Sequence, residues 1–266
     1  QSLLSLAFLC FLLTRSIFHG SSTSVHYSNP SYIWGYTEPS TGNRKPVDDF
    51  REAFTYLRDN TPKHCMVLSW WDYGYQIAGM AERGTIVDNN TWNKTHIARV
   101  GKIFATNERE AWEMCKELDV DYVLVLFGGM VGLDGDDLNK LGWMSKIAAE
   151  EYEEIDAKQY RGPFNPKDAP EALKNSLMYK LSYYRFDEAN NGEGLGFDNA
   201  RDVNVFGTKI QLKYFKEAFT SINWMIRIYR PLPASSITPD YPSRPPNSHH
   251  PLYELPSNYP NKNTID

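Results

Sequence analysis

Tyr122-Val123-Leu124-Val125-Leu126-Phe127 is the stretch of sequence that decides the fold. Its apolar residues follow one another without alternation, which is typical of a strand buried on both faces of a parallel sheet. A second such run, Cys65-Met66-Val67-Leu68, precedes it, and helical patterns lie between the two. Strands that alternate with helices predict an α/β domain. We therefore expect a mixed or mostly parallel sheet flanked by helices.

The helices around these strands are indicated by periodicity and by residues that start or stop a helix. Phe50, Phe54 and Leu57 recur at helical spacing behind two acids, and Pro62 ends that helix. Further helices are predicted at 75–82, 95–104, 107–118, 137–153 and 171–184, and strands at 85–88 and 223–229. The 266 residues are 41% hydrophobic, which is enough apolar material for one sizeable core.

The ends of the chain differ from its middle. Residues 3–13 form an apolar run that Arg15 closes, which predicts the end of a transmembrane helix whose beginning is missing. A signal peptide is the alternative, although the basic segment expected before its apolar core is absent. The predicted organisation is a membrane-helix end at 1–19, a connector at 20–46, an α/β domain at 47–230 and a Pro-rich flexible tail at 231–266.

Composition excludes several classes of function. A net charge of −5 and a pI near 5.7 argue against nucleic-acid binding, which needs clustered Lys and Arg. The three cysteines and six histidines lack the spacing of a zinc site. Asp134, Asp136 and Asp137 resemble the start of a calcium loop, but the Gly and Glu that such a loop requires are Asn139 and Ser145. We interpret the three acids as a solvated turn.

Trp70-Trp71-Asp72-Tyr73-Gly74 follows the first predicted strand and is the strongest candidate for a binding site. Ligands of open α/β sheets bind at the carboxyl ends of the strands. Indole N–H groups can donate to a hydroxyl, the carboxylate can accept from it, and the rings can contact a methyl group. The motif therefore fits a pocket for a Ser or Thr side chain. The alternative is an aromatic cluster that only packs beneath the next helix.

The same pentapeptide resembles the signature of the catalytic subunit of eukaryotic oligosaccharyltransferase, within its C-terminal lumenal part. Further similar segments follow in the same order, at 87–93, 119–125 and 177–180, with a weaker one at 226–229. The resemblance implies a membrane glycosyltransferase that moves a preassembled oligosaccharide from dolichyl diphosphate to Asn in Asn-x-Ser/Thr sequons. It also implies that Trp70, Trp71, Asp72, Tyr73 and Gly74 bind the acceptor Ser or Thr.

The resemblance extends to a second motif, in which Asp137, Lys140 and Met144 share one face of a predicted helix. It implies that Lys140 and Met144 hold the acceptor peptide near its hydroxyl residue, with Met144 against the Thr methyl. Taken alone, the pattern is typical of an exposed ion pair and a core methionine. Tyr75 corresponds to a position that contacts the lipid-linked donor, and the alternative is a tyrosine on the surface of a helix.

The remaining predictions concern modification, cofactors and partners. Asn89 and Asn93 begin two sequons and are candidate glycosylation sites in a lumenal domain. The resemblance implies Mn²⁺ or Mg²⁺ held by a transmembrane portion that this chain lacks, so neither a catalytic residue nor a metal ligand is assigned here. Expected partners are the acceptor polypeptide, the lipid-linked oligosaccharide, other oligosaccharyltransferase subunits and the endoplasmic reticulum membrane, but not nucleic acid.

Two other functions remain open from the sequence. A secreted carbohydrate-binding module would use exposed Trp and Tyr rings to stack on sugars. A hydrolase would use Asp72 and Asp88 as an acid pair.

Overall fold

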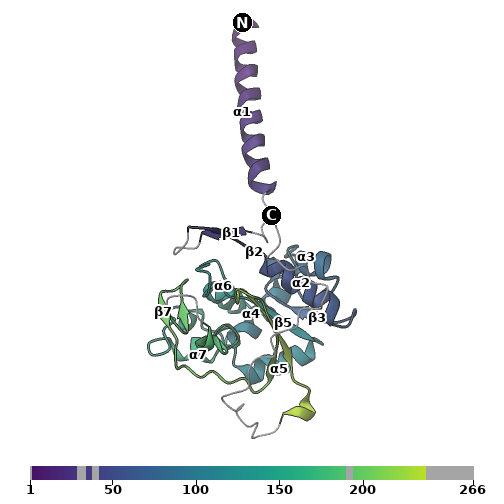
Figure 1. The fold of residues 1–266 in the computed structure, drawn as a ribbon. Helices are drawn as coiled ribbons and strands as arrows, with labels where there is room; N and C mark the ends of the chain where they lie inside the picture. The colour runs from purple at the N-terminus through teal and green to yellow at the C-terminus, as the bar shows by residue number, and fades with distance from the viewer. Residues whose placement is uncertain (1, 29–33, 38–41, 190–193, 238–266) are drawn as a thin grey trace. The chain divides into compact units, whose positions relative to one another are not determined.

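A five-stranded sheet with the order β4-β3-β5-β9-β8 organises the computed structural model of the chain (Figure 1). The structure describes residues 2–28, 34–37, 42–189 and 194–237. The sheet strands are β3 (Met66–Leu68), β4 (Gly84–Thr85), β5 (Tyr122–Leu126), β8 (Phe215–Thr220) and β9 (Ile226–Pro231). β3 pairs in parallel with β4 and β5, whereas β9 pairs antiparallel with β5 and β8. The expectation of a mixed sheet is confirmed.

Helices surround this sheet at positions close to those predicted. They are α2 (Asp49–Asn60), α3 (Gly74–Gln76), α4 (Lys94–Ala105), α5 (Glu108–Glu117), α6 (Asp137–Ala148), α7 (Glu171–Asn175) and α8 (Leu177–Tyr183). A π-helical turn, Ile77–Ala81, continues α3, and 3₁₀ turns occur at Trp71–Tyr73, Ala157–Tyr160, Phe186–Glu188 and Ala234–Ser236. Two-stranded sheets pair β1 (Trp34–Thr37) with β2 (Arg44–Val47) and β6 (Phe197–Asp198) with β7 (Val203–Asn204).

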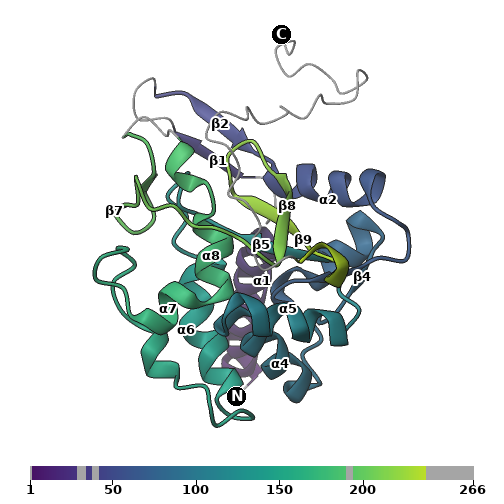
Figure 2. The ribbon, with the colours of Figure 1, turned by 90° about the horizontal axis from the view of Figure 1, so that it is seen from below.

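The alternation of side chains along β9 puts different helices on the two faces of the sheet. Ile228 pairs with Phe219 of β8, whose ring stacks on Tyr56 of α2 at 4.7 Å between centroids. The next residue, Tyr229, points to the opposite face and donates to the carbonyl oxygen of Leu181 in α8 at 2.6 Å. In Figure 2, β8 and β9 accordingly lie between α2 and α8.

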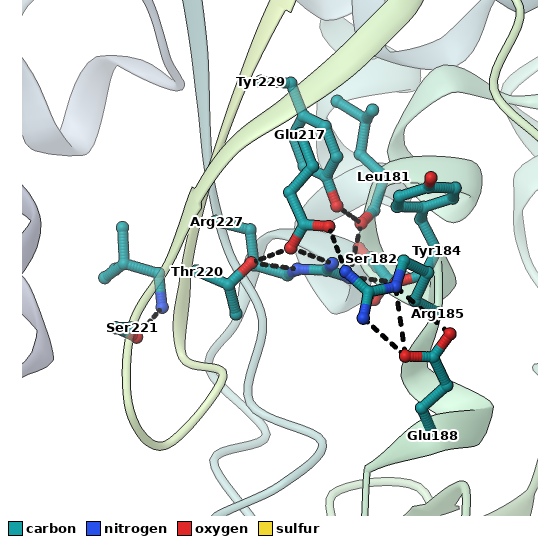
Figure 3. A network of polar contacts seen from close by, with 11 residues as sticks. Leu181, Ser182, Tyr184, Arg185, Glu188, Glu217, Thr220, Ser221, Arg227 and Tyr229 are labelled. Carbon is teal, nitrogen blue, oxygen red and sulfur yellow. Dashed lines mark hydrogen bonds and ion pairs between the residues drawn. The ribbon is translucent and has the colours of Figure 1, made fainter. Parts of the chain in front are cut away.

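A buried arginine ties the β8–β9 hairpin to the end of α8 (Figure 3). Arg227 Nη1 donates to the carbonyl oxygens of Leu181, Ser182 and Tyr184, which are acceptors near the helix C-terminus. Its Nη2 donates to Glu217 Oε1 at 3.2 Å. Because Arg227 has no exposed surface, these contacts replace the water that its charge would otherwise require.

Three predicted elements are shorter than the patterns suggested. The strand predicted at 85–88 is observed at Gly84–Thr85, and Asp88 already belongs to the turn that leads to α4. The predicted helix at 137–153 ends at Ala148. The one at 171–184 divides at Ser176, whose hydroxyl caps α8 by accepting from the Tyr179 N–H at 3.2 Å.

The N-terminal apolar segment forms one helix, α1 (Ser2–Ser28). Leu3–Ser24 is long and apolar enough to cross a membrane, judged by length and composition alone. The helix therefore continues beyond the boundary at residue 19 that the sequence indicated. Most of the predicted Pro-rich tail lies outside the described residues.

Candidate functional site

The two sequence motifs meet at one edge of the sheet. β3 ends at Leu68 and leads into Trp70, while β5 ends at Leu126 and leads through a loop to α6. These strands are parallel neighbours, so their carboxyl ends lie together. Lys140 Nζ lies 2.5 Å from Asp72 Oδ2, which joins the motifs directly. Residues separated by 68 positions in sequence thus form one cluster.

The neighbouring tryptophans have different environments. Trp70 is only 3% exposed and packs in the core, whereas Trp71 is half-buried and borders a hollow at the surface. Their ring centroids are 6.3 Å apart and their planes are inclined by 49°. One ring of the pair therefore lies in the core and the other at the surface. Trp71 presents an aromatic wall, and Trp70 supports it from within.

Asp72 has one carboxylate oxygen bound and one available. Oδ2 accepts from Lys140, but Oδ1 has no hydrogen-bond partner among the residues that the structure describes. The side chains of Asp72 and Lys140 are 25% and 29% exposed, so both reach the surface. The ammonium group keeps the carboxylate in place without filling its second acceptor position. A hydroxyl donor can therefore approach Asp72.

Asp137 is fully buried and acts within the protein rather than at its surface. Oδ1 accepts from the Tyr73 hydroxyl at 2.8 Å, and Oδ2 accepts from the backbone N–H of Leu126 at 2.8 Å. Burial raises the pKa of Asp137 to about 7, while nearby Lys140 opposes this shift. Burial also raises the pKa of Tyr73 well above its ordinary value, so the phenol retains its proton and can donate.

Met144 lies one turn beyond Lys140 but exposes no surface. Its backbone oxygen would lie 2.6 Å from a Cβ built on Gly101, so α4 and α6 approach each other very closely there. An acceptor cannot contact the Met144 side chain in this arrangement. The methionine instead fills the space behind the helix face that carries Lys140.

Asn89 holds the Trp-Trp-Asp segment in position. Its Nδ2 donates to the Asp72 carbonyl oxygen at 2.9 Å, and its Oδ1 accepts from the Tyr75 N–H at 3.1 Å. The residue before Asn89 also passes close to the motif. A Cβ on residue 74 would lie 2.4 Å from Asp88 Cα, so this position requires Gly74. The side chain of Tyr75, which follows the motif, is 56% exposed to solvent.

The second sequon residue, Asn93, has a different role from Asn89. It is the N-cap of α4, and its Oδ1 accepts from the His96 N–H at 3.0 Å. Its Nδ2 makes no hydrogen bond with any part of the chain that the structure describes. The preceding residue, Trp92, is 78% exposed.

The interpretation of the acidic turn was wrong for two of its three residues. Asp134 is exposed, but Asp136 and Asp137 are fully buried. Asp136 caps α6 by accepting from Asn139 N–H at 3.0 Å, and it also forms an ion pair with Arg201. Arg201 pairs in addition with Asp198 at 2.8 Å. Sequence reasoning missed Arg201 because Asp136 lies 65 positions away in the chain and no periodic pattern marks the arginine.

No cluster of three or more His, Cys, Asp or Glu suited to a metal ion occurs in the described ranges, 2–28, 34–37, 42–189 and 194–237. Asp72 lies beside the Lys140 ammonium group, whose charge would repel a cation, and Asp137 is enclosed. These residues do not fit the divalent cation that the resemblance implies.

Comparisons with known proteins point to one family. Residues 63–161 match the family model described as the STT3/PglB/AglB core domain. The chain is 46% identical over 237 residues to the dolichyl-diphosphooligosaccharide–protein glycosyltransferase subunit stt-3 of Caenorhabditis elegans, covering 86% of this chain and 31% of the relative. It is also 46% identical to subunit STT3 of Saccharomyces cerevisiae, covering 83% of this chain and 31% of the relative. The chain thus spans about a third of the length of these relatives.

Several similar solved structures come from an archaeon. The C-terminal globular domain of an oligosaccharyltransferase from Archaeoglobus fulgidus aligns at 20% identity with a TM-score of 0.43, over 69% of this chain and 97% of that one. Another oligosaccharyltransferase of the same organism, tethered to an acceptor peptide with an NVT sequon, aligns at 19% identity with a TM-score of 0.43. That alignment covers 66% of this chain and 24% of the other.

Proposed function

Because this chain belongs to the STT3 family over the part of the subunit that it spans, we propose that it is the acceptor-binding part of an oligosaccharyltransferase catalytic subunit. The enzyme transfers a preassembled oligosaccharide from dolichyl diphosphate to the amide nitrogen of Asn in an Asn-x-Ser/Thr sequon. This part recognises the hydroxyl residue of the sequon. The Asp72–Lys140 pair beside Trp71 is the single observation that carries the proposal.

Recognition of the hydroxyl follows from the groups on this edge of the sheet. The Ser or Thr hydroxyl donates to Asp72 Oδ1 and accepts an indole N–H, while the Trp71 ring keeps water from the contact. Lys140 holds the carboxylate in position through its 2.5 Å contact with Oδ2. A side chain without the hydroxyl would leave these polar groups unpaired, which can reduce reactivity by as much as about 10⁴-fold.

The other candidate residues take supporting parts in the same proposal. Tyr73 and Asp137 fix Lys140 from beneath, because its Nζ donates to the Tyr73 hydroxyl at 3.3 Å and lies 4.0 Å from Asp137 Oδ1. Met144 shapes the wall behind Lys140, and Gly74 allows the loop of Asp88 to approach. Tyr75 is exposed where it could meet the lipid-linked donor.

Catalysis and metal binding are assigned to the remainder of the subunit. The Mn²⁺ or Mg²⁺ ion would supply charge stabilisation there, and the residues of this chain contribute acceptor position only. We place the domain in the lumen of the endoplasmic reticulum, with α1 in the membrane and other oligosaccharyltransferase subunits around it. The candidate span at Leu3–Ser24 supports the membrane attachment.

The test compares the full-length enzyme with its Asp72→Ala variant on matched Asn-x-Thr, Asn-x-Ser and Asn-x-Val peptides. Loss of a hydrogen bond to a charged group predicts a fall in kcat/KM for the Thr peptide of about 10- to 100-fold. Asp59→Ala is the control, because Asp59 is exposed on α2 and lies outside the cluster. Undiminished transfer to the Thr peptide by Asp72→Ala would refute the hydroxyl site.

A further inference from the structure

A hollow of about 520 Å³ lies beside the Trp71 ring, and we name it the Trp71 groove. It is lined by Trp71, Asn89, Thr91, Lys94, Ile97, Ala98, Ile147, Glu150 and Glu151. These residues come from the Trp-Trp-Asp motif, the loop before α4, the first half of α4 and the end of α6. A smaller hollow of about 150 Å³ shares Thr91 and Ile97 with the groove and is also lined by Trp92 and His96.

We propose that the Trp71 groove is a second acceptor subsite, which takes a Lys or Arg side chain that flanks the sequon. This inference rests on the proposed function, because it assumes that the acceptor hydroxyl binds at Asp72. It adds a preference outside the Asn-x-Ser/Thr tripeptide, decided by Glu150 and Glu151, which follow the end of α6.

The groove is continuous with the hydroxyl site through two residues. Trp71 lines the groove and is covalently next to Asp72. Asn89 also lines it, and its Nδ2 holds the Asp72 carbonyl oxygen at 2.9 Å. A peptide whose hydroxyl residue lies against Asp72 therefore carries its neighbours across the Trp71 ring. An extended chain advances about 3.3 Å per residue, so the groove is within reach of residues close to the sequon.

The floor of the groove is apolar. Ile97 and Ala98 of α4 are buried, and Ile147 of α6 is half-buried beside them. Together with the Trp71 ring they can cover the methylene stem of a long side chain. Lys and Arg bury such stems while their charged ends remain in water. An aromatic face beside the stem adds a cation–π attraction for the charged end.

The rim of the groove carries more acidic than basic charge. Glu150 and Glu151 are both exposed at the end of α6, and Lys94 is the basic residue of the lining. Lys94 makes no ion pair within 4.0 Å among the described residues, so it does not neutralise either glutamate directly. Glu151 Oε1 accepts from the Thr95 hydroxyl at 3.5 Å and keeps a second oxygen for another donor. This charge distribution favours a basic side chain over an acidic one.

The expected preference is small because the carboxylates are solvated. Exposed ion pairs and exposed cation–π contacts each account for only a few-fold change in binding. We expect kcat/KM for a Lys-containing peptide to exceed that for its Glu counterpart by about two- to five-fold, and salt to reduce the difference.

The test uses the full-length enzyme in its native complex and peptides with a fixed Asn-x-Thr sequon. Lys, Met or Glu is placed in turn at each of several positions on either side. The enzyme is compared with a variant carrying Glu150→Lys and Glu151→Lys. Glu113→Lys is the matched control, because Glu113 is an exposed acid of α5 outside the groove. Circular dichroism checks that each variant retains its fold.

The result expected is a Lys-over-Glu preference at one or two flanking positions, which the double variant reverses and the control retains. An unchanged ratio at every position would overturn the proposal. A loss of activity that is equal for all peptides would also overturn it, because the groove would then serve another partner. A further pair of matched Asn-x-Thr and Asn-x-Val peptides separates the two proposals, since the Thr-over-Val discrimination depends on Asp72 and should be the same in wild type and double variant.

Discussion

Asp137 carries the most perturbed carboxyl group of the site, and its environment predicts a dependence of stability on pH. Its pKa is raised from 3.8 to about 7 because it is fully buried. Between these values the unfolded chain releases a proton that the folded chain keeps. The free energy of unfolding should therefore decrease as pH rises, by at most about 1.4 kcal/mol per pH unit, and level off above about pH 7.

Asp137→Asn tests this dependence because it keeps an acceptor for Tyr73 but cannot titrate. Denaturant unfolding of the chain at pH 5 and pH 7.5 should give a smaller difference for the variant than for wild type. Asp136 is buried with a raised pKa as well, so some dependence remains in both proteins. Asp59→Asn, at an exposed position, should behave as wild type. Equal slopes in wild type and Asp137→Asn would contradict the prediction.

Met144 is the residue whose proposed role changes most when its surroundings are known. Met144→Ala leaves a cavity in the hydrophobic core, so it should lower the free energy of unfolding by about 2–5 kcal/mol. We expect the Thr-over-Ser ratio in kcat/KM to fall as well, because the helix face that carries Lys140 loses its support. Unfolding measurements and matched peptides give the two quantities. Lost stability with an unchanged ratio would make Met144 a core residue without a part in acceptor binding.

At the scale of elements, Arg227 predicts how the hairpin depends on α8. Arg227→Met leaves three carbonyl oxygens without the donor that Arg227 Nη1 supplies, and it leaves Glu217 without its buried cationic partner. Breaking a buried ion pair of this kind should reduce the free energy of unfolding by about 3–5 kcal/mol. Denaturant unfolding measures the loss. Arg58→Met, at an exposed arginine, should change stability by less than about 0.5 kcal/mol.

The elements that sequence predicted well are those with continuous or periodic apolar residues. β3, β5 and α2 follow from such patterns, and so does the position of the Trp-Trp-Asp motif at a strand end. The resemblance implied only that Lys140 lies near the Trp-Trp-Asp motif. The ion pair between Asp72 and Lys140 was not predicted, because no local pattern brings together residues so far apart. Asn89 was interpreted only as the first residue of a sequon. Its two hydrogen bonds to the motif depend on the path of the loop before α4, which brings Asn89 back to residues 72 and 75. The burial of Asp136 depends on Arg201, which no periodicity could indicate.

At the scale of the whole molecule, the proposed lumenal location predicts a glycan on Asn93 rather than on Asn89. A sugar on Asn93 Nδ2 leaves Oδ1 free to cap α4 through His96. The amide nitrogen of Asn89 instead faces the Asp72 carbonyl, within the acceptor site. Mass spectrometry of glycopeptides from native material should find Asn93 modified. Asn93→Gln is the matched control and should remove the glycan, whereas an unmodified Asn93 in native material would count against a lumenal location.

The place of β9 in the sheet has a consequence for the time course of synthesis. One edge of β5 pairs with β3. Its other edge stays unpaired until β9 is made, about 100 residues further along the chain. At roughly 5–20 residues per second, a ribosome needs about 5–20 s to make that stretch. During this interval the apolar β5 edge is open to unintended pairing. A pause in translation before residue 226 should therefore favour aggregation, although every residue of the hydroxyl site has already been made.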